Sequence, residues 1–387
     1  MLISHTWTLW CGTALAAAAA AYAVTAAIAL RTRLKPPAPL ATLPHAAPAV
    51  TVLKPLCGAE HELYECLRSF CDQAYPRFQI VFGVSDGADP ALEVIARLQR
   101  EFPALDLKLA VDRRQHGSSR KVSNLINMLP LASHDYLVIS DSDVRVSRDY
   151  LSSVVAPLLD PGVGIVTCPY RGNPRPGFWS LLGSLFINDW FIPSVRVAAM
   201  SGSRAFAFGV TIAIRRQVLA RIGGFAAIAN QLADDYRLGE LTRRLGLRTV
   251  LSDVVVETCV DEQSFGALVR HELRWLRTIR AVRPIGYALS FITFGVPVAL
   301  IGALLAGGTL PALALVGVTT GARIVVHVRA HGAEPAPARH ALVLPVRDAL
   351  SVILWIWGFA TRRVHWRDDR YRVSRDGSAH PVVRITP

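Results

Sequence analysis

The chain has 387 residues, of which 52% are hydrophobic and 18% charged, and its formal net charge is +13 at pH 7. This composition excludes a disordered or collagen-like protein. The mean hydropathy of +0.33 is high for a soluble domain, whereas the charged residues are too many for a bundle of membrane helices alone. We therefore expect a soluble domain joined to membrane segments. The basic excess leaves nucleic acid, anionic lipid or an anionic substrate open as partners.

A first membrane segment is predicted at the N-terminus, where residues 7–30 contain no charged side chain. This run is longer than the roughly 20 residues that a helix needs to cross a bilayer. A cleaved signal peptide would have a shorter apolar stretch, with its basic residues before it. Here Arg31, Arg33 and Lys35 follow the run, so residues 1–34 are expected to be an anchor that leaves the following chain in the cytoplasm. The Pro- and Ala-rich residues 35–47 then form a linker.

Two more spans are expected after the soluble part. Residues 284–322 carry no charge, and this run is long enough for two crossings of roughly 20 residues each. Gly307, Gly308 and Pro311 mark a turn between them. We therefore predict a transmembrane hairpin over residues 285–328.

A third C-terminal segment, residues 341–361, contains Arg347 and Asp348 and precedes a basic tail over 362–387. A full span would place this tail outside the cell, against the positive-inside rule. A re-entrant or interfacial segment is therefore favoured over a span, and the tail is expected in the cytoplasm.

Residues 263–284, which connect the soluble part to the hairpin, have the pattern of an amphipathic helix lying in the membrane surface. The alternative is a solvated basic face, but the direct connection to membrane segments favours the interface. Much of the positive charge thus lies at the membrane boundary, and we do not expect nucleic acid as a partner. The basic stripe is Arg270, Arg274 and Arg277, and the apolar stripe is Leu268, Trp275, Leu276 and Ile279.

Residues 48–262 are predicted to form one α/β domain, because apolar runs rich in β-branched residues alternate with helical patterns. Such alternation is typical of a doubly wound parallel sheet, in which ligands bind at the carboxyl ends of the strands. Asp89 is expected to cap the second helix, with Pro90 in its first turn. The expected strands are 49–53, 79–84, 107–111 and 136–140, and the expected helices are 60–71, 90–102 and 118–128.

The ends of these strands carry candidate site residues. Lys54 follows the first strand, Asp86 the second, and Asp141 and Asp143 the fourth. A lone aspartate at a strand end is commonly a turn residue. Two carboxylates in an Asp-Ser-Asp can instead converge on one hard cation, and Mg²⁺ is often shared between carboxylates and substrate phosphates. We therefore predict a Mg²⁺ or Mn²⁺ site at Asp141 and Asp143.

Other common sites are not indicated. The sequence contains neither the glycine-rich dinucleotide motif after its first strand nor a Walker phosphate loop, so a dinucleotide enzyme or a P-loop NTPase is not expected. The six cysteines lack the spacing of zinc ligands. In a cytoplasmic domain they are predicted to be reduced and mostly buried.

A second acidic pair follows a glycine turn, where Gly223 and Gly224 precede Asp234 and Asp235. Asp234 can be a helix cap. Capping does not explain why a second carboxylate follows directly, and a carboxylate beside an acceptor hydroxyl can remove its proton. Asp235 is therefore a candidate general base.

Together these motifs resemble the inverting glycosyltransferases of family 2 type, in particular the membrane-bound ceramide glucosyltransferase-like group. The resemblance covers residues 48–285 and implies a nucleotide-diphospho-sugar transferase (GT-A) fold with a parallel sheet. Three stretches are most similar to the bacterial hopanoid-biosynthesis glycosyltransferase. The motifs are Lys-Pro-Leu-x-Gly at Lys54, Ser-Asp at Asp86, Asp-Ser-Asp at Asp141, Gly-Gly-Phe at Gly223, Asp-Asp-Tyr at Asp234 and Arg-Trp at Arg274, and the three stretches begin at Arg120, Thr167 and His271.

The resemblance implies a role for each matched residue. Asp86 would contact the uracil end of a UDP-sugar, and Lys54 and Lys121 would lie near the nucleotide or its phosphates. Asp141 and Asp143 would hold the diphosphate through Mg²⁺ or Mn²⁺. Asp235 would deprotonate the acceptor hydroxyl. Arg274 and Trp275 would close the site beside the diphosphate and acceptor, and His271 begins the closing motif.

Two departures from the ceramide enzymes matter for the acceptor. Their closing motif usually begins with Gln or Arg where this chain has His271, and their Asp-Ser-Gly is Asp-Ser-Asp here. The first departure argues against ceramide glucosylation, and the second favours a fuller metal site. Both fit the hopanoid branch, which implies transfer of N-acetylglucosamine to bacteriohopanetetrol at the cytoplasmic face of a bacterial inner membrane. The alternatives are ceramide glucosylation from UDP-glucose, a processive polysaccharide synthase, and a non-catalytic membrane protein that binds anionic lipid.

Overall fold

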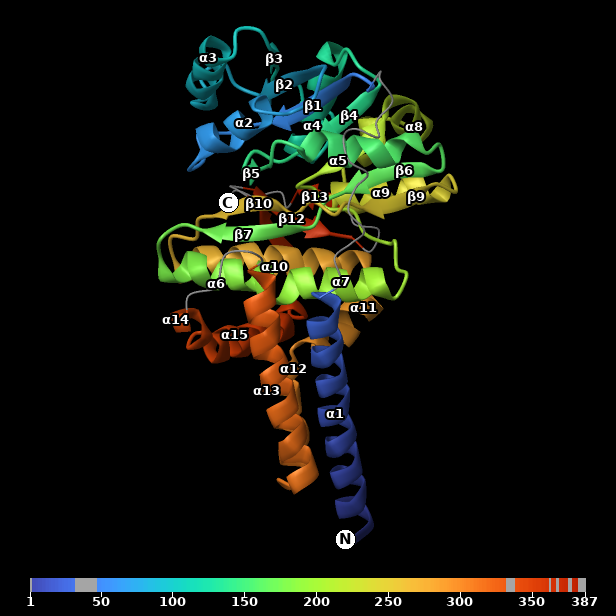
Figure 1. Ribbon diagram of the computed structural model, residues 1–387, viewed down its shortest axis with the longest axis vertical. Helices are drawn as coiled ribbons and strands as arrows, with labels where there is room; N and C mark the ends of the chain where they lie inside the picture. Colours follow the sequence, from blue (N-terminus) through green and yellow to red (C-terminus); the bar gives the residue numbers. More distant parts are fainter. Residues whose placement is uncertain are drawn as a thin grey trace, which may run out of the picture. The chain divides into compact units, whose positions relative to one another are not determined.

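Figure 1 shows the computed structural model, which describes residues 2–31, 47–331, 338–361, 363–366, 369–374 and 378–381. The chain divides into two compact units. The sheet unit comprises Leu34–Asn173, Ser203–Asp261 and Asp369–Pro387, and the helical unit comprises Met1–Arg33, Pro174–Gly202 and Glu262–Asp368.

The sheet unit is built on a mixed sheet of seven strands. Their spatial order is β3 (Asp106–Val111), β2 (Phe78–Val84), β1 (Val50–Pro55), β4 (Tyr136–Ile139), β8 (Ile212–Arg215), β6 (Val163–Thr167) and β9 (Arg248–Leu251). Leu53 of β1 pairs with Val81 of β2 and with Ile139 of β4, both in parallel. The predicted α/β fold and its first four strands are confirmed.

Strand β8 is the exception to the predicted parallel sheet, because it runs antiparallel to both β4 and β6. It has only four residues, and a short apolar run carries no signal of its direction. It also follows the long excursion of the chain into the helical unit rather than a direct β-α-β crossover.

Helices of the sheet unit start slightly later than the sequence predicts. Ser119 caps α4, its side chain accepting a hydrogen bond from the backbone N–H of Val122. Pro90, rather than Asp89, is the residue immediately before α3, but the Asp89 carboxylate still accepts from the N–H of Ala91 and from that of Gly58. The helices are α2 (Leu63–Cys71), α3 (Ala91–Glu101), α4 (Arg120–Met128), α5 (Tyr150–Val155), α8 (Arg216–Arg221) and α9 (Asp234–Arg244), with short 3-10 turns at Leu129–Leu131, Ala156–Leu159 and Phe225–Ile228.

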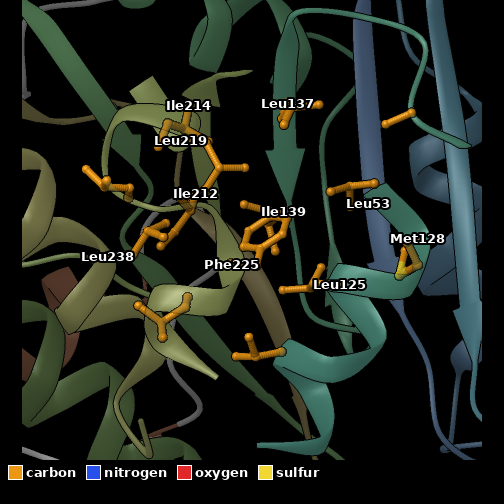
Figure 2. Packing of buried hydrophobic residues seen from close by; sticks show 14 of the residues in the cluster. Leu53, Leu125, Met128, Leu137, Ile139, Ile212, Ile214, Leu219, Phe225 and Leu238 are labelled. Atoms are coloured by element: carbon orange, nitrogen blue, oxygen red, sulfur yellow. The ribbon is translucent and has the colours of Figure 1, made fainter. Parts of the chain in front are cut away.

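The core of the sheet unit lies between the sheet and helices α4, α8 and α9. Figure 2 shows its aliphatic side chains meeting around Phe225. Full burial of one such side chain stabilises a fold by about 1.5–3 kcal/mol. This core fixes β1, β4 and α4, the elements whose ends carry Lys54, Asp141 and Lys121. The labelled core residues are Leu53, Leu125, Met128, Leu137, Ile139, Ile212, Ile214, Leu219, Phe225 and Leu238.

A second sheet of three strands, β5 (Val144–Arg145), β10 (Val256–Val260) and β7 (Tyr170–Pro174), lies in the same unit. Its antiparallel pairing sets Thr258 opposite Val144. This register places a threonine hydroxyl beside the Asp-Ser-Asp that precedes β5.

The predicted basic tail contains strands as well. Strand β12 (Asp369–Val373) pairs with β13 (Ala379–Pro381), and both belong to the sheet unit. The Tyr371 hydroxyl donates to the carbonyl of Ser118. Ser378 forms an isolated antiparallel β-bridge with Gln231. Strand β11 (Arg363–Trp366) belongs to the helical unit. Residues 35–46 of the predicted linker and four of the seven tail arginines lie outside the described residues.

In the helical unit, α1, α12 and α13 pack together, and the apolar run α6-η4-α7 contacts α1, α10 and α13 (Figure 1). This run interrupts the single domain predicted over 48–262. Phe186 of this run packs in one cluster with Leu273 and Leu276 of α10 and Leu354 of α15. The elements are α1 (Leu2–Ala29), α6 (Phe178–Phe186), η4 (Ile187–Phe191), α7 (Ile192–Met200), α10 (Phe265–Val282), α11 (Pro284–Leu289), η6 (Ser290–Thr293), α12 (Gly295–Leu305), α13 (Leu310–Ala330), α14 (Ala338–Ala341) and α15 (Leu344–Gly358).

Among the described residues, two helices are long and apolar enough to span a membrane: Thr6–Ala29 within α1, and Leu310–Ala330. The first arm of the predicted hairpin is broken, because Pro284–Thr293 and Gly295–Leu305 are bent by 76°. With 11 residues, α12 is about 17 Å long, too short to cross a bilayer by itself. The expected turn is present, since φ is +67° at Gly307 and +68° at Gly308.

Two glycines allow α1 and α12 to approach closely. A Cβ on Gly302 would lie 2.6 Å from the carbonyl oxygen of Gly12 and 2.7 Å from the nitrogen of Ala16. Small residues that let two backbones approach are typical of membrane helix contacts. The N-terminal helix is thereby fixed to the C-terminal membrane segments.

We predict that Gly302→Val destabilises the helical unit by about 1–3 kcal/mol, as overpacking typically does. Backbone atoms are the ones displaced, so the neighbours cannot simply rotate away. Thermal unfolding of the detergent-solubilised protein measures the effect. Gly317→Val is the matched control, because a Cβ there meets nothing within 4 Å. Equal melting temperatures for the two variants would contradict the predicted contact.

Candidate active site

The Asp-Ser-Asp lies where the large sheet continues into the small one. Asp141 follows β4 after Ser140, and Asp143 directly precedes β5. The Thr258 hydroxyl donates to Oδ2 of Asp143 at 2.7 Å. Burial and the charge of Asp141 raise the pKa of Asp143, although the threonine bond opposes the shift. The chain thus holds two carboxylates together at an energetic cost.

Lys121 offsets part of this charge from the first turn of α4. Its Nζ forms an ion pair with Oδ1 of Asp141 and lies 3.8 Å from Oδ2 of Asp234. Burial lowers the pKa of Lys121, but the two carboxylates outweigh burial and hold that pKa above its usual range. The lysine therefore stays charged and joins the end of β4 to the start of α9.

Gly209 is the point on which three of these groups converge. A Cβ built on it would lie 3.2 Å from Nζ of Lys121, 3.4 Å from Oδ2 of Asp141 and 3.5 Å from Oδ2 of Asp235. A side chain here would occupy the space that these charged ends share. The sequence analysis missed Gly209, since a single glycine in a loop carries no motif; its place shortly before a buried strand is the only available signal.

Asp235 occupies the second position of α9. Its Oδ2 accepts from the N–H of Gly209 at 2.8 Å, and its Oδ1 accepts from the N–H of Tyr236 at 2.7 Å. Burial and then the charge of Asp234 raise the pKa of Asp235 to about 6. A carboxylate with this pKa is ionised at neutral pH and is a better proton acceptor than an ordinary aspartate.

The expected capping role of Asp234 is wrong. The residue before α9 is Ala233, and its side chain makes no cap. The Asp234 carboxylate instead faces Lys121. Burial raises the pKa of Asp234, and Lys121 reduces this shift. Both residues of the Asp-Asp pair therefore belong to the charged cluster.

Lys54, near the end of β1, contacts the backbone of the Asp-Ser-Asp. Its buried Nζ donates to the backbone carbonyl of Asp141 and to Oγ of Ser140, and it lies 3.9 Å from the centre of the Phe70 ring. Burial lowers the pKa of Lys54 to about 8, despite the nearby carboxylates. This lysine supports the backbone of the Asp-Ser-Asp rather than pairing with a carboxylate.

Asp86 follows β2 as predicted, and its carboxylate is exposed. It accepts from the N–H of Ala88 at 3.0 Å and from Arg113 at 2.7 Å. These two bonds hold the pKa of Asp86 below its usual range. Asp86 thus has partners of its own, separate from the charges around Gly209.

The residues of the predicted closing motif lie on α10 in the helical unit. Nδ1 of His271 hydrogen-bonds Oε1 of Glu262 at 2.5 Å, and the His271 ring packs edge-on against Trp275. Arg274 is one turn along from His271, so the three side chains share one region of the helix. Their action beside the acidic cluster stays a prediction.

The donor set at the Asp-Ser-Asp suits a hard divalent cation. Asp141 and Asp143 offer carboxylate oxygens, which Mg²⁺ and Mn²⁺ prefer. Two carboxylates suffice where substrate phosphates complete the coordination. Oδ1 of Asp143 is not used by the Thr258 bond, and Oδ2 of Asp141 faces the space around Gly209. These residues therefore fit the predicted cofactor. Of the six cysteines, which are predicted to be mostly buried, Cys66, Cys71 and Cys168 are buried, whereas Cys11 and Cys57 are exposed.

Known proteins similar to this chain include two ceramide glucosyltransferases. Ceramide glucosyltransferase 3 of Caenorhabditis elegans is 21% identical over 238 residues, covering 61% of this chain and 52% of the relative. The ceramide glucosyltransferase of Gibberella zeae is 29% identical over 150 residues, covering 36% and 28%. The chain thus spans about half the length of the first of these curated relatives, and less of the second.

A solved structure shows the same fold. It is a mannosyltransferase from Pyrobaculum calidifontis in complex with GDP-Man and Mn²⁺, which matches with a TM-score of 0.56 and 23% identity. The match covers 91% of this chain and 99% of that chain. The sheet unit has the GT-A type of glycosyltransferase fold.

The profile of one protein family extends over nearly the whole chain, from the N-terminal helix to the last strands. It matches residues 10–379 and therefore includes both units described above. The chain belongs to glycosyl transferase family 21.

Proposed function

We propose that this protein transfers a hexose from a UDP-sugar to a hydroxyl group of a membrane lipid, with inversion at the anomeric carbon. The observation that carries the proposal is the convergence of Lys121, Asp141 and Asp235 on the space beside Gly209. These three residues would supply a positive charge for a phosphate, a ligand for the cation and the candidate base, respectively. Family membership and two helices able to span a bilayer support a glycosyltransferase that acts on lipids.

On the donor side, Asp141 and Asp143 would hold Mg²⁺ or Mn²⁺, which neutralises charge on a leaving diphosphate. Lys121 places a permanent positive charge next to these carboxylates, suited to a phosphate oxygen. Lys54 holds the Asp141 backbone in place through its hydrogen bond to the Asp141 carbonyl. Asp86, at the end of β2, is proposed to contact the uracil.

On the acceptor side, Asp235 would take the proton from the attacking hydroxyl. Its two hydrogen bonds to backbone N–H groups fix the carboxylate, so little reorganisation is needed as the proton transfers. A hydroxyl that attacks directly from the face opposite the diphosphate inverts the anomeric configuration. His271, Arg274 and Trp275 are proposed to close the site.

Two lipids are candidates for the acceptor. The similar proteins named ceramide glucosyltransferases favour ceramide with UDP-glucose. The three stretches that begin at Arg120, Thr167 and His271, and the Asp-Ser-Asp, favour bacteriohopanetetrol with UDP-N-acetylglucosamine. In either case the acceptor stays in the bilayer. We propose a multi-pass protein of the bacterial inner membrane, with the sheet unit in the cytoplasm.

The base assignment predicts that Asp235→Asn lowers turnover at least about a hundredfold. An amide keeps the shape of the carboxylate but cannot take the proton. UDP-sugar binding, measured by isothermal titration, should remain. Two effects on the melting temperature oppose each other. Loss of an ionised carboxylate whose pKa is raised by folding favours stability at neutral pH, whereas the amide nitrogen can no longer accept from one of the two backbone N–H groups. Turnover near the wild-type rate would remove Asp235 from the role of base.

The same assignment predicts a pH profile. A base works only when ionised, and the pKa of Asp235 is about 6, so kcat/KM should rise with pH up to about 6 and level off above it. Initial rates of lipid glycosylation, measured at pH values on both sides of 6, give the position of this acidic limb of the pH profile. In Asp86→Asn the limb should stay at the same pH, since the pKa of Asp86 is low and Asp86 takes no proton. An acidic limb that moves in this variant contradicts the assignment.

The whole proposal predicts sugar transfer by the purified protein in lipid nanodiscs. We expect a single hexose or N-acetylhexosamine on the lipid by mass spectrometry, loss of transfer with EDTA, and recovery with Mn²⁺ or Mg²⁺. Ceramide and bacteriohopanetetrol, each offered with both UDP-sugars, identify the substrates. A polymeric product would indicate a processive synthase. Absence of both transfer and metal-dependent UDP binding would favour a non-catalytic lipid-binding protein.

A further inference from the structure

Apart from the proposed active site, the helical unit contains a second cluster of ligand-type side chains. Asp189, His327 and His331 each offer one ligand atom, and these atoms lie within 4.8 Å of one another. Asp189 is in the π-helical turn η4, a kind of turn that is frequent at functional sites. His327 is in the last turn of α13, and His331 follows four residues later. This spacing places two histidines on one helix face, as in many zinc sites.

The hydrogen bonds of the cluster orient its histidines. Nδ1 of His327 bonds Oδ2 of Asp189 at 2.7 Å, and Nδ1 of His331 bonds the backbone carbonyl of His327 at 2.9 Å. A carbonyl oxygen can only accept, so Nδ1 of His331 donates and its Nε2 keeps a lone pair. The bond from Nδ1 of His331 to a carbonyl is of the kind that typically orients histidines that bind metals, and it leaves Nε2 of His331 as the ligand atom.

The cluster also has buried ligand capacity that no protein group uses. The side chains of Asp189 and His327 are 1% and 3% exposed, yet Oδ1 of Asp189 and Nε2 of His327 have no hydrogen-bond partner. Nδ1 of His340 is likewise buried without a partner, and the His340 ring lies 6.5 Å from that of His327 and 6.2 Å from that of His331. Such groups are rarely left unpaired in a folded protein.

The surrounding charge suits a cation. Arg323 donates to Asp189 at 2.9 Å and pairs with Asp348 at 3.0 Å, so this arginine is shared by two carboxylates. With neutral histidines, the group therefore carries one uncompensated negative charge. A divalent ion would offset it.

We propose that Asp189, His327 and His331 bind a Zn²⁺ ion. Two imidazole nitrogens and one carboxylate are a known zinc ligand set, in contrast to the oxygen ligands of the Asp-Ser-Asp. The ion would replace the proton between Nδ1 of His327 and Oδ2 of Asp189, and Nε2 of His331 would complete the set. The ion joins η4 to the end of α13, two parts of the helical unit that are far apart in the sequence.

Zinc content of the full-length protein tests this proposal. The protein is purified in detergent with a tag free of histidine and passed over a chelating resin. We expect about one zinc per chain by mass spectrometry. In His331→Gln, which loses a single hydrogen bond to the backbone, zinc affinity should fall at least about tenfold. Added Zn²⁺ should raise the melting temperature of the wild type but not that of the variant.

Two controls separate this site from other metal binding. His61→Gln changes an exposed histidine of the sheet unit and should keep its zinc. Asp143→Asn should also keep it, which excludes the Asp-Ser-Asp as the zinc site. Co²⁺ added to the zinc-free wild type should give the visible absorption of tetrahedral cobalt, and Asp189→Asn and His327→Gln should each weaken it. Zinc at the same level in wild type and His331→Gln, or no tetrahedral cobalt spectrum, would overturn the proposal.

Discussion

The ion pairs of Lys121 are the interaction on which the proposed active site depends. Asp141, Asp234 and Asp235 come from two separate parts of the chain and would repel one another in a partly buried space. A lysine between Asp141 and Asp234 makes this arrangement possible. Two unit charges about 4 Å apart interact by about 4 kcal/mol at the effective dielectric constant typical of such places. Carboxylates outnumber the lysine, so the site keeps an excess of negative charge. Burial first, and then a neighbouring carboxylate, raise the pKa values of Asp143, Asp234 and Asp235.

This unequal balance has a chemical consequence. An exposed aspartate without the neighbouring Asp234 would have an ordinary pKa and would be a weaker base toward an acceptor hydroxyl. Here burial and the neighbouring Asp234 raise the pKa of Asp235 to about 6, while Asp235 remains ionised at neutral pH. The same excess of negative charge attracts a divalent cation to Asp141 and Asp143. Base strength and cation binding thus share one contribution, the negative charge of closely packed carboxylates, while burial supplies the larger part of the raised pKa of Asp235.

Much of this could be read from the sequence, because its signals are local. β-Branched runs placed the first four strands within two residues, and the strand ends placed Lys54, Asp86 and Asp141 correctly. Long-range pairing leaves no such signal. The direction of β8, the bond from Thr258 to Asp143 and the approach of Gly209 all depend on segments that meet only in the folded chain. The capping role expected for Asp234 was wrong for the same reason, since its partner Lys121 is distant in the sequence.

The helical unit shows why hydropathy alone describes a membrane-associated protein incompletely. An uncharged run from 284 to 322 predicts two equal spans, but Phe294 and Gly295 lie at a bend that leaves α12 too short to cross alone. Charged residues in the apolar segments are paired instead of exposed: Arg347 forms a bidentate pair with Glu272, which joins α15 to α10. Removing one partner of such a buried pair is strongly destabilising. Arg347 therefore requires α15 to pack against α10, the helix that carries His271, Arg274 and Trp275. The residues proposed to close the active site are thus held by a helix that is itself fixed through an arginine in the third apolar segment.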